Sequence, residues 1–201
     1  MQNRCVTESH VEPIQQTMPG LYAQILGPRW HELAEPVRRL HTQGAVVEAA
    51  GTFRVTRGSN IAARLLAWLA RLPAECDAVD LKLTVTPTGS REEWKRAFGP
   101  QLLVSMQWTQ ADGLLTEHMG PNELRFQLDV ADGTLFYLTK AVALRLGPCR
   151  LWLPSFLAPQ VTASEKPQGN GVQVSVEVRL PLLGRLITYE GTLTRVEARA
   201  D

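Results

Sequence analysis

Cysteine is scarce in this chain, and its three cysteines are not spaced as in motifs where two cysteines bind a metal or react together. Cys5, Cys76 and Cys149 lie far apart, and no Cys-x-x-Cys pair exists. This spacing excludes a zinc knuckle and a thioredoxin-like redox site. Unpaired thiols are most simply expected in a reducing compartment, so we predict a cytoplasmic protein.

Long hydrophobic runs and an excess of one charge are also absent. No apolar run approaches the roughly 18 residues of a membrane-spanning helix. Lys plus Arg number 21 and Asp plus Glu number 20, which leaves a net charge of +1. Because the basic residues are interleaved with acids rather than clustered, we expect no nucleic-acid partner.

The common catalytic and metal-binding signatures are missing. There is no Gly-x-Ser-x-Gly nucleophile elbow, and no Gly-x-Gly-x-x-Gly follows a predicted strand. His31-Glu32 begins like a metalloprotease helix, but residue 35 is Glu and Pro36 breaks the turn. We therefore predict no metal site and no bound cofactor.

The length and apolar content fit one domain with a sizeable core. The chain has 201 residues, of which 44% are hydrophobic, and a domain of this size buries roughly 70% of its unfolded surface. Residues 1–17 lack any periodicity, so we expect a flexible leader there. A single β-rich domain is predicted over 18–201.

Helical spacing of apolar residues is confined to the first third of the chain. One helical pattern opens at Pro19, and a second covers about Trp30 to Leu40. A third is predicted from Asn60 to Leu72, with Ser59 as its N-cap and Pro73 as its stop.

Period-two alternation dominates the remainder, from Val46 onward. The strictest run is Val172, Val174, Val176 and Val178. Short turn signals such as Asp132-Gly133 separate the runs and favour antiparallel hairpins. The pattern predicts an α+β but mainly β fold, an antiparallel β-barrel or strongly curled sheet of about nine to ten strands covered by the N-terminal helices.

A set of short motifs extends from Leu21 to about Val196. They are Leu21-Tyr-x-x-Ile-Leu-Gly, Gly51-x-x-x-Val-x-Arg57-Gly, Trp94-x-Arg96-x-Phe98-Gly, Ser105, Gly113-Leu-Leu-x-Glu117-x-x-Gly120 and Leu180-Pro-Leu-Leu-Gly-Arg-Leu-Ile-x-Tyr189-x-Gly191. In these motifs the chain resembles a family of uncharacterised bacterial domains, whose members occur alone or fused to NAD(P)-binding domains similar to saccharopine dehydrogenase. The resemblance implies no established activity, and it implies a reductase as a possible partner.

Two arginines are placed on apolar strand faces. Arg57 follows Phe53 and Val55, and Arg96 lies between Trp94 and Phe98. A buried guanidinium must be paired, because an unpaired internal charge costs several kcal/mol. Internal partners would be Glu117 or Glu190, the acids expected inside; a ligand carboxylate or phosphate is the alternative, and solvated arginines follow if the faces are reversed.

Catalysis is a weaker expectation than binding. Ser105 needs a base, but Glu117 and His118 are neighbours on a strand and point to opposite faces, so all three do not readily converge. Glu117 is the candidate for acid–base work, although a carboxylate that faces arginine suits anchoring better.

The sequence therefore favours a binding module for a small apolar or amphipathic ligand with an acidic head group. The candidate ligand-binding residues are Arg57, Trp94, Arg96, Phe98, Glu117 and Tyr189. The alternatives are an enzyme acting through Glu117 and a non-catalytic partner domain of a reductase, which would have a filled interior.

The apolar helix at 60–72 has two interpretations. It is either a core-covering helix or a lid over the barrel mouth that touches a membrane through Trp68, Arg64 and Arg71. Two positive charges anchor weakly, so we expect at most transient membrane contact.

Overall fold

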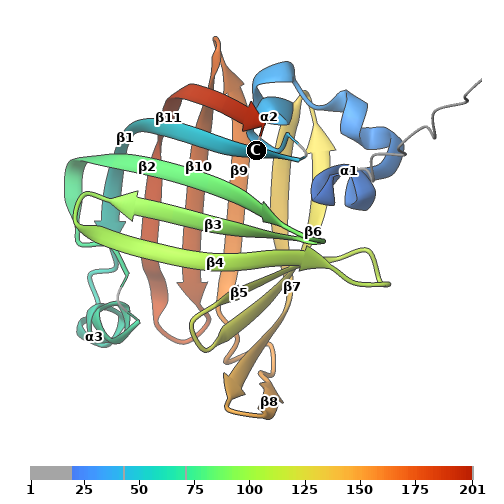
Figure 1. Ribbon diagram of the computed structural model, residues 1–201. Helices are drawn as coiled ribbons and strands as arrows, with labels where there is room; N and C mark the ends of the chain where they lie inside the picture. Colours follow the sequence, from blue (N-terminus) through green and yellow to red (C-terminus); the bar gives the residue numbers. More distant parts are fainter. Residues whose placement is uncertain (1–19, 43, 71, 201) are drawn as a thin grey trace, which may run out of the picture.

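The computed structural model describes residues 20–42, 44–70 and 72–200, and the predicted leader at 1–17 lies outside them (Figure 1). Strands make up most of the described chain. The helices are α1 (Leu21–Leu26), the 3-10 helix η1 (Gly27–Glu32), α2 (Glu35–Leu40) and α3 (Ile61–Leu69). The strands are β1 (Ala45–Arg57), β2 (Cys76–Thr88), β3 (Arg91–Phe98), β4 (Gln101–Thr109), β5 (Leu115–Met119), β6 (Asn122–Ala131), β7 (Thr134–Leu146), β8 (Cys149–Trp152), β9 (Gln160–Gln168), β10 (Gly171–Leu180) and β11 (Gly184–Ala200).

The sheet closes into an antiparallel barrel, as predicted. The strand order is β6-β5-β4-β3-β2-β1-β11-β10-β9-β7-β8, and β6 also pairs with β7. That last pairing joins the two ends of the series, so ten strands form a closed ring and β8 extends outward from β7. Closure leaves few unpaired edges, which is why successive hairpins favour this arrangement.

Local sequence explains the hairpins. Asp132 and Gly133 both have positive φ, at 50° and 74°, between β6 and β7. A type I′ turn needs this conformation at both central residues, and it matches the twist of the two strands that it joins.

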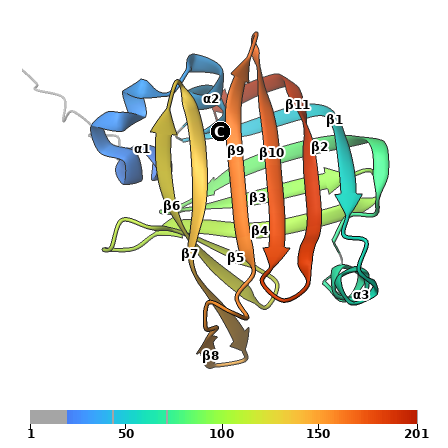
Figure 2. The same ribbon diagram turned by 180° about the vertical axis from the view of Figure 1, so that it is seen from behind.

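The N-terminal helices plug one end of the barrel (Figures 1 and 2). Leu21, Tyr22, Val37 and Leu40 are buried against the strands. The single helix predicted from Trp30 to Leu40 is wrong, because the 3-10 helix and α2 are separate there. Pro36 lies in the first turn of α2, where a missing N–H is tolerated.

Helix α3 lies at the opposite end of the barrel, in both views (Figures 1 and 2). Among the α3 side chains that the structure describes, only Ala63 and Ala67 are buried, and Ile61, Leu65, Leu66 and Trp68 are exposed, so the interpretation of α3 as a core-covering helix is wrong. The N-cap is Asn60 and not Ser59, because the Asn60 side chain accepts a hydrogen bond from the Ala62 amide. In the described part of the chain, no helix combines the length and apolarity needed to cross a bilayer.

Strand β4 faces the opposite way from what its hydrophobicity suggests. Ser105 and Gln107 are buried, whereas Leu102 and Val104 are exposed on the outer wall. The polar pair faces inward because it bonds to other interior polar groups, described below.

Gly51 lies where the backbones of β1 and β11 come very close, at a register shift between Ala50 and Gly51. A Cβ atom at residue 51 would lie 1.9 Å from the Thr192 carbonyl oxygen. The atoms in the way are backbone atoms, which cannot move aside without a large cost in free energy. We therefore expect Gly51→Ala to lower the free energy of unfolding by about 2–4 kcal/mol in urea titrations. Arg54→Ala, on the exposed face of the same strand, is the control and should change it by less than about 0.5 kcal/mol.

Candidate functional site

The barrel encloses a cavity of about 430 Å³. Its wall is mainly apolar, and each strand of the closed ring contributes to it. The polar residues that line it are Arg96, Gln107, Asn122, Glu117, Tyr137, Glu165 and Tyr189. Leu66 of α3 and Leu157 also line it, and both are exposed to solvent. The cavity therefore runs from the interior of the barrel to the end where α3 lies.

Arg96, Ser105 and Glu117 form a hydrogen-bonded cluster in the wall. Arg96 Nη1 donates to Ser105 Oγ at 2.8 Å, and Nη2 donates to Glu117 Oε1 at 3.1 Å. Ser105 Oγ donates to the same Glu117 oxygen at 2.5 Å. The three residues come from β3, β4 and β5, which are consecutive antiparallel strands. Their inward positions follow from the register of these strands.

The face of Trp94 supports the guanidinium. Arg96 Cζ lies 5.0 Å from the centroid of the Trp94 ring, within cation–π range. Burial is the largest single influence on the pKa of Arg96 and lowers it, but Glu117, Tyr189 and Tyr22 together outweigh burial, so the pKa of the guanidinium is raised. Arg96 is thus a fixed positive charge. Burial also raises the pKa of Tyr189, although Arg96 lowers it in part, so this phenol is a neutral donor at physiological pH.

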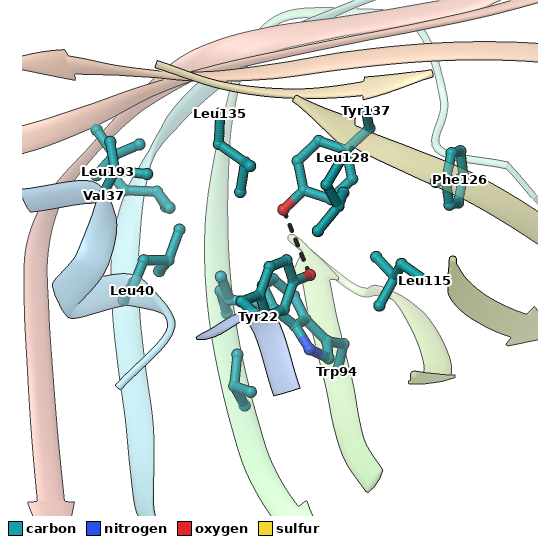
Figure 3. Close-up of a cluster of buried hydrophobic side chains, with 14 of the residues drawn as sticks. Tyr22, Val37, Leu40, Trp94, Leu115, Phe126, Leu128, Leu135, Tyr137 and Leu193 are labelled. Carbon is teal, nitrogen blue, oxygen red and sulfur yellow. Dashed lines mark hydrogen bonds between the residues drawn. The ribbon is translucent and has the colours of Figure 1, made fainter. Parts of the chain in front are cut away.

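A second polar group lies beneath the helical plug (Figure 3). Tyr22 of α1 donates to Gln107 Oε1 at 2.7 Å, and the Tyr137 oxygen lies 3.3 Å from the Tyr22 oxygen. Tyr137 donates to Glu165 Oε1 at 2.9 Å, and His41 Nε2 lies 2.6 Å from Glu165 Oε2. Burial raises the pKa values of both tyrosines well above the usual one. This chain of contacts fastens α1 and α2 to the barrel interior.

Four of the six candidate residues from the sequence line the cavity: Trp94, Arg96, Glu117 and Tyr189. Phe98 is buried just behind them, with its ring packed edge-on against Phe53 and Tyr189 at centroid distances of 6.2 and 5.3 Å.

Arg57 takes no part in the cavity wall. Its Nε donates to the Pro73 carbonyl at 2.9 Å and its Nη2 to the Leu72 carbonyl at 2.5 Å. This arginine therefore fastens the segment between α3 and β2 to the end of β1.

The prediction that Glu190 lies inside is wrong, because its side chain is exposed. Glu165 occupies the interior instead, and the sequence analysis missed it. The sequence pattern does indicate the inward position of Glu165, because it shares the alternating positions of Val161 and Ala163 on β9. All three residues line the cavity. Gln107 was also missed, because the alternation of Leu102, Val104 and Met106 on β4 indicates that the opposite face of this strand is the inner one.

Ser105 and Glu117 do meet, whereas His118 does not line the cavity. The expected failure of these three residues to converge is confirmed, with His118 as the residue left out. The serine therefore has a carboxylate neighbour and no imidazole among the described cavity residues.

Removing Glu117 leaves a buried cation without its partner. The side chains of Arg96 and Glu117 are only 16% and 14% exposed. We expect Glu117→Leu to cost about 3 kcal/mol of unfolding free energy in urea titrations. Arg96→Leu/Glu117→Leu should recover at least half of that loss, because it removes both charges. A double variant less stable than Glu117→Leu would contradict the ion-pair interpretation.

Glu92, next to this site on β3, makes stability depend on pH. Its Oε2 accepts a hydrogen bond from Trp94 Nε1 at 3.1 Å. Burial raises the pKa of Glu92, and neighbouring His41 and the Trp94 bond lower it by less. The folded state therefore prefers the protonated carboxyl, so this contribution to stability is present below the unfolded pKa and is lost as pH rises through the folded value.

Glu92→Gln keeps the hydrogen-bond acceptor and removes the charge. We expect it to raise the melting temperature at pH 7, with the gain shrinking to zero as the pH falls below about 4. Thermal unfolding followed by circular dichroism across this range checks the sign, with the exposed Glu48→Gln as control.

A family model described as "Domain of unknown function (DUF4166)" matches residues 33–193, from the helical plug to the interior of β11. No curated protein and no solved structure matches the chain. Because the match covers well over half of the sequence, the chain belongs to this family of domains of unknown function.

Proposed function

We propose that this barrel binds a small apolar or amphipathic molecule, with the acidic head group of the ligand at Arg96. The observation that carries the proposal is the cavity itself. Its volume of about 430 Å³ falls in the range of about 300–1,000 Å³ that small-molecule sites occupy. The wall is apolar apart from a few convergent polar groups, which is the usual composition of such a site.

Arg96 has capacity for a ligand even though it is paired. A guanidinium has five N–H donors. Ser105 accepts a hydrogen bond from Nη1 of Arg96, and Glu117 accepts one from Nη2. The remaining donors suit a carboxylate or sulfonate as an additional acceptor. The Tyr189 hydroxyl is a second donor for the same head group. Arg57 does not enter the proposal, because its donors bind backbone carbonyls.

Two other roles have less support. Acid–base catalysis would use Glu117, but one oxygen of that carboxylate already accepts from both Arg96 and Ser105. A role as a bacterial partner domain of a reductase rests on the resemblance to fused relatives alone. A pure interaction module would have a filled interior, and the cavity argues against it.

A matched pair of fluorescent probes tests the site. Anilinonaphthalene sulfonate is anionic, and phenylnaphthylamine has a similar aromatic body without the charge. We expect both to bind, and Arg96→Leu/Glu117→Leu to weaken the anionic probe by about tenfold or more while the neutral one is unchanged. Arg54→Leu, on the outer wall, is the control and should affect neither.

Glu117→Gln tests the same site in the opposite direction. The amide would keep an acceptor for Arg96 and Ser105 but remove the competing negative charge, so the anionic probe should bind more tightly than to the wild type. If each probe bound every variant with the same affinity as the wild type, the assignment of the head group to Arg96 would be refuted. Native mass spectrometry of the purified protein then identifies any acid or lipid that co-purifies.

A further inference from the structure

Large apolar side chains are exposed at one end of the barrel. Of the thirteen exposed large hydrophobic residues in the described chain, ten lie in α3, around β8 and in the turn between β10 and β11. We name these the apolar rim: Ile61, Leu65, Leu66, Trp68, Leu146, Leu151, Trp152, Phe156, Leu157 and Leu182. Both views place their elements at the end opposite α1 and α2 (Figures 1 and 2).

The exposure at the rim is large. Ile61 is 85% exposed, Trp68 67% and Leu182 73%. The opposite end contrasts with it, since its hairpin turns read Gly89-Ser90, Asp132-Gly133 and Gly169-Asn170. None of the exposed large hydrophobics of the described chain lies in those turns. Large apolar side chains exposed together at one end of a protein are a feature of interaction sites.

The rim is continuous with the cavity. Leu66 and Leu157 belong to the rim and also line the cavity wall. Leu180 and Leu186, on either side of the turn that carries Leu182, line the wall as well. An apolar molecule that leaves the cavity here would pass over apolar side chains and would not first cross a polar surface.

Several arginines lie on the same elements as the apolar rim. Arg64 on α3 and Arg185 at the start of β11 are exposed and have no acidic partner among the described residues. Arg150 stacks on Trp152 with Cζ 4.3 Å from the ring centroid, and it shares the buried Glu123 with Arg145. Two arginines thus face one acid there. Aromatic and aliphatic side chains flanked by arginine suit the headgroup boundary of an anionic bilayer.

A second copy of the chain fits the rim less well. An isologous dimer would place each patch against itself, so the unpaired Arg64 and Arg185 would meet their own copies or one another. Anionic lipid headgroups instead neutralise them.

We propose that the apolar rim docks on the surface of a membrane that contains anionic lipids, so that the cavity opens onto the bilayer and exchanges its ligand there. This inference rests on the proposed function for the identity of the exchanged molecule. Docking itself is measured separately from ligand binding, so the two can fail independently.

Co-flotation with lipid vesicles tests docking. We expect the wild-type protein to float with vesicles of phosphatidylcholine mixed with phosphatidylglycerol, and to bind pure phosphatidylcholine roughly tenfold more weakly, since arginines near the surface are attracted to anionic headgroups. Leu65→Ser/Trp68→Ser should weaken binding to the mixed vesicles by at least about tenfold, because both side chains are exposed and supply apolar contact.

The matched control is Val104→Ser/Leu138→Ser, which removes two exposed apolar side chains from the outer wall. It should bind vesicles like the wild type. Arg64→Gln/Arg185→Gln should lose the preference for anionic vesicles and keep the weaker binding, which separates the electrostatic contribution from the apolar contribution of Leu65 and Trp68. Phenylnaphthylamine binding should be unchanged in all three variants, which shows that the cavity is intact.

Absence of flotation by the wild type, or equal loss in the rim and wall variants, would overturn the proposal. So would a concentration-dependent dimer in sedimentation velocity that Leu65→Ser/Trp68→Ser abolishes, because the rim would then be an interface between two copies.

Discussion

The pairing of β1 with β11 is the constraint on which the rest of this structure depends. It joins the first strand of the chain to the last, from Ala45 opposite Ala200 to Arg57 opposite Ile187. Without that ladder the ten strands would form an open sheet with two edges and no interior. With it, the sheet has an inside, an outside and two ends. Closure also forces the backbones together at Gly51 and Gly191, where a Cβ atom would meet a carbonyl oxygen of the neighbouring strand.

The interior of the closed barrel contains both apolar and polar side chains. Apolar residues form most of the wall, yet Arg96, Glu117, Glu165, Gln107 and two tyrosines are also inside. Polar groups removed from water need partners, and here they bond mainly to each other. The two resulting clusters both contribute to the cavity wall but differ in what they hold. The cluster of Tyr22, Tyr137, Glu165 and His41 fastens the helical plug, whereas Arg96, paired with Glu117, keeps further N–H donors.

The two ends of the barrel have different surfaces because different elements cap them. The plug buries its large side chains and leaves polar turns around it. Helix α3 does the reverse, since it packs against the barrel through Ala63 and Ala67 and turns Ile61, Leu65 and Trp68 to solvent. Small inward residues allow α3 to lie close to the end of β11, while Arg57 fastens the segment that follows. One end is thereby a closed base and the other an apolar mouth.

The sequence by itself determined the class of fold and placed Trp94, Arg96 and Phe98 on one apolar strand face. Those features depend on period-two alternation and turn chemistry, which are local. Only the tertiary structure decided which face of an ambiguous strand turned inward, as on β4, and which acid met which base, as when Glu165 and not Glu190 entered the interior. It also decided that the apolar residues of α3 face solvent. These outcomes depend on partners far along the chain, and barrel closure brings those partners together only after every strand has its register.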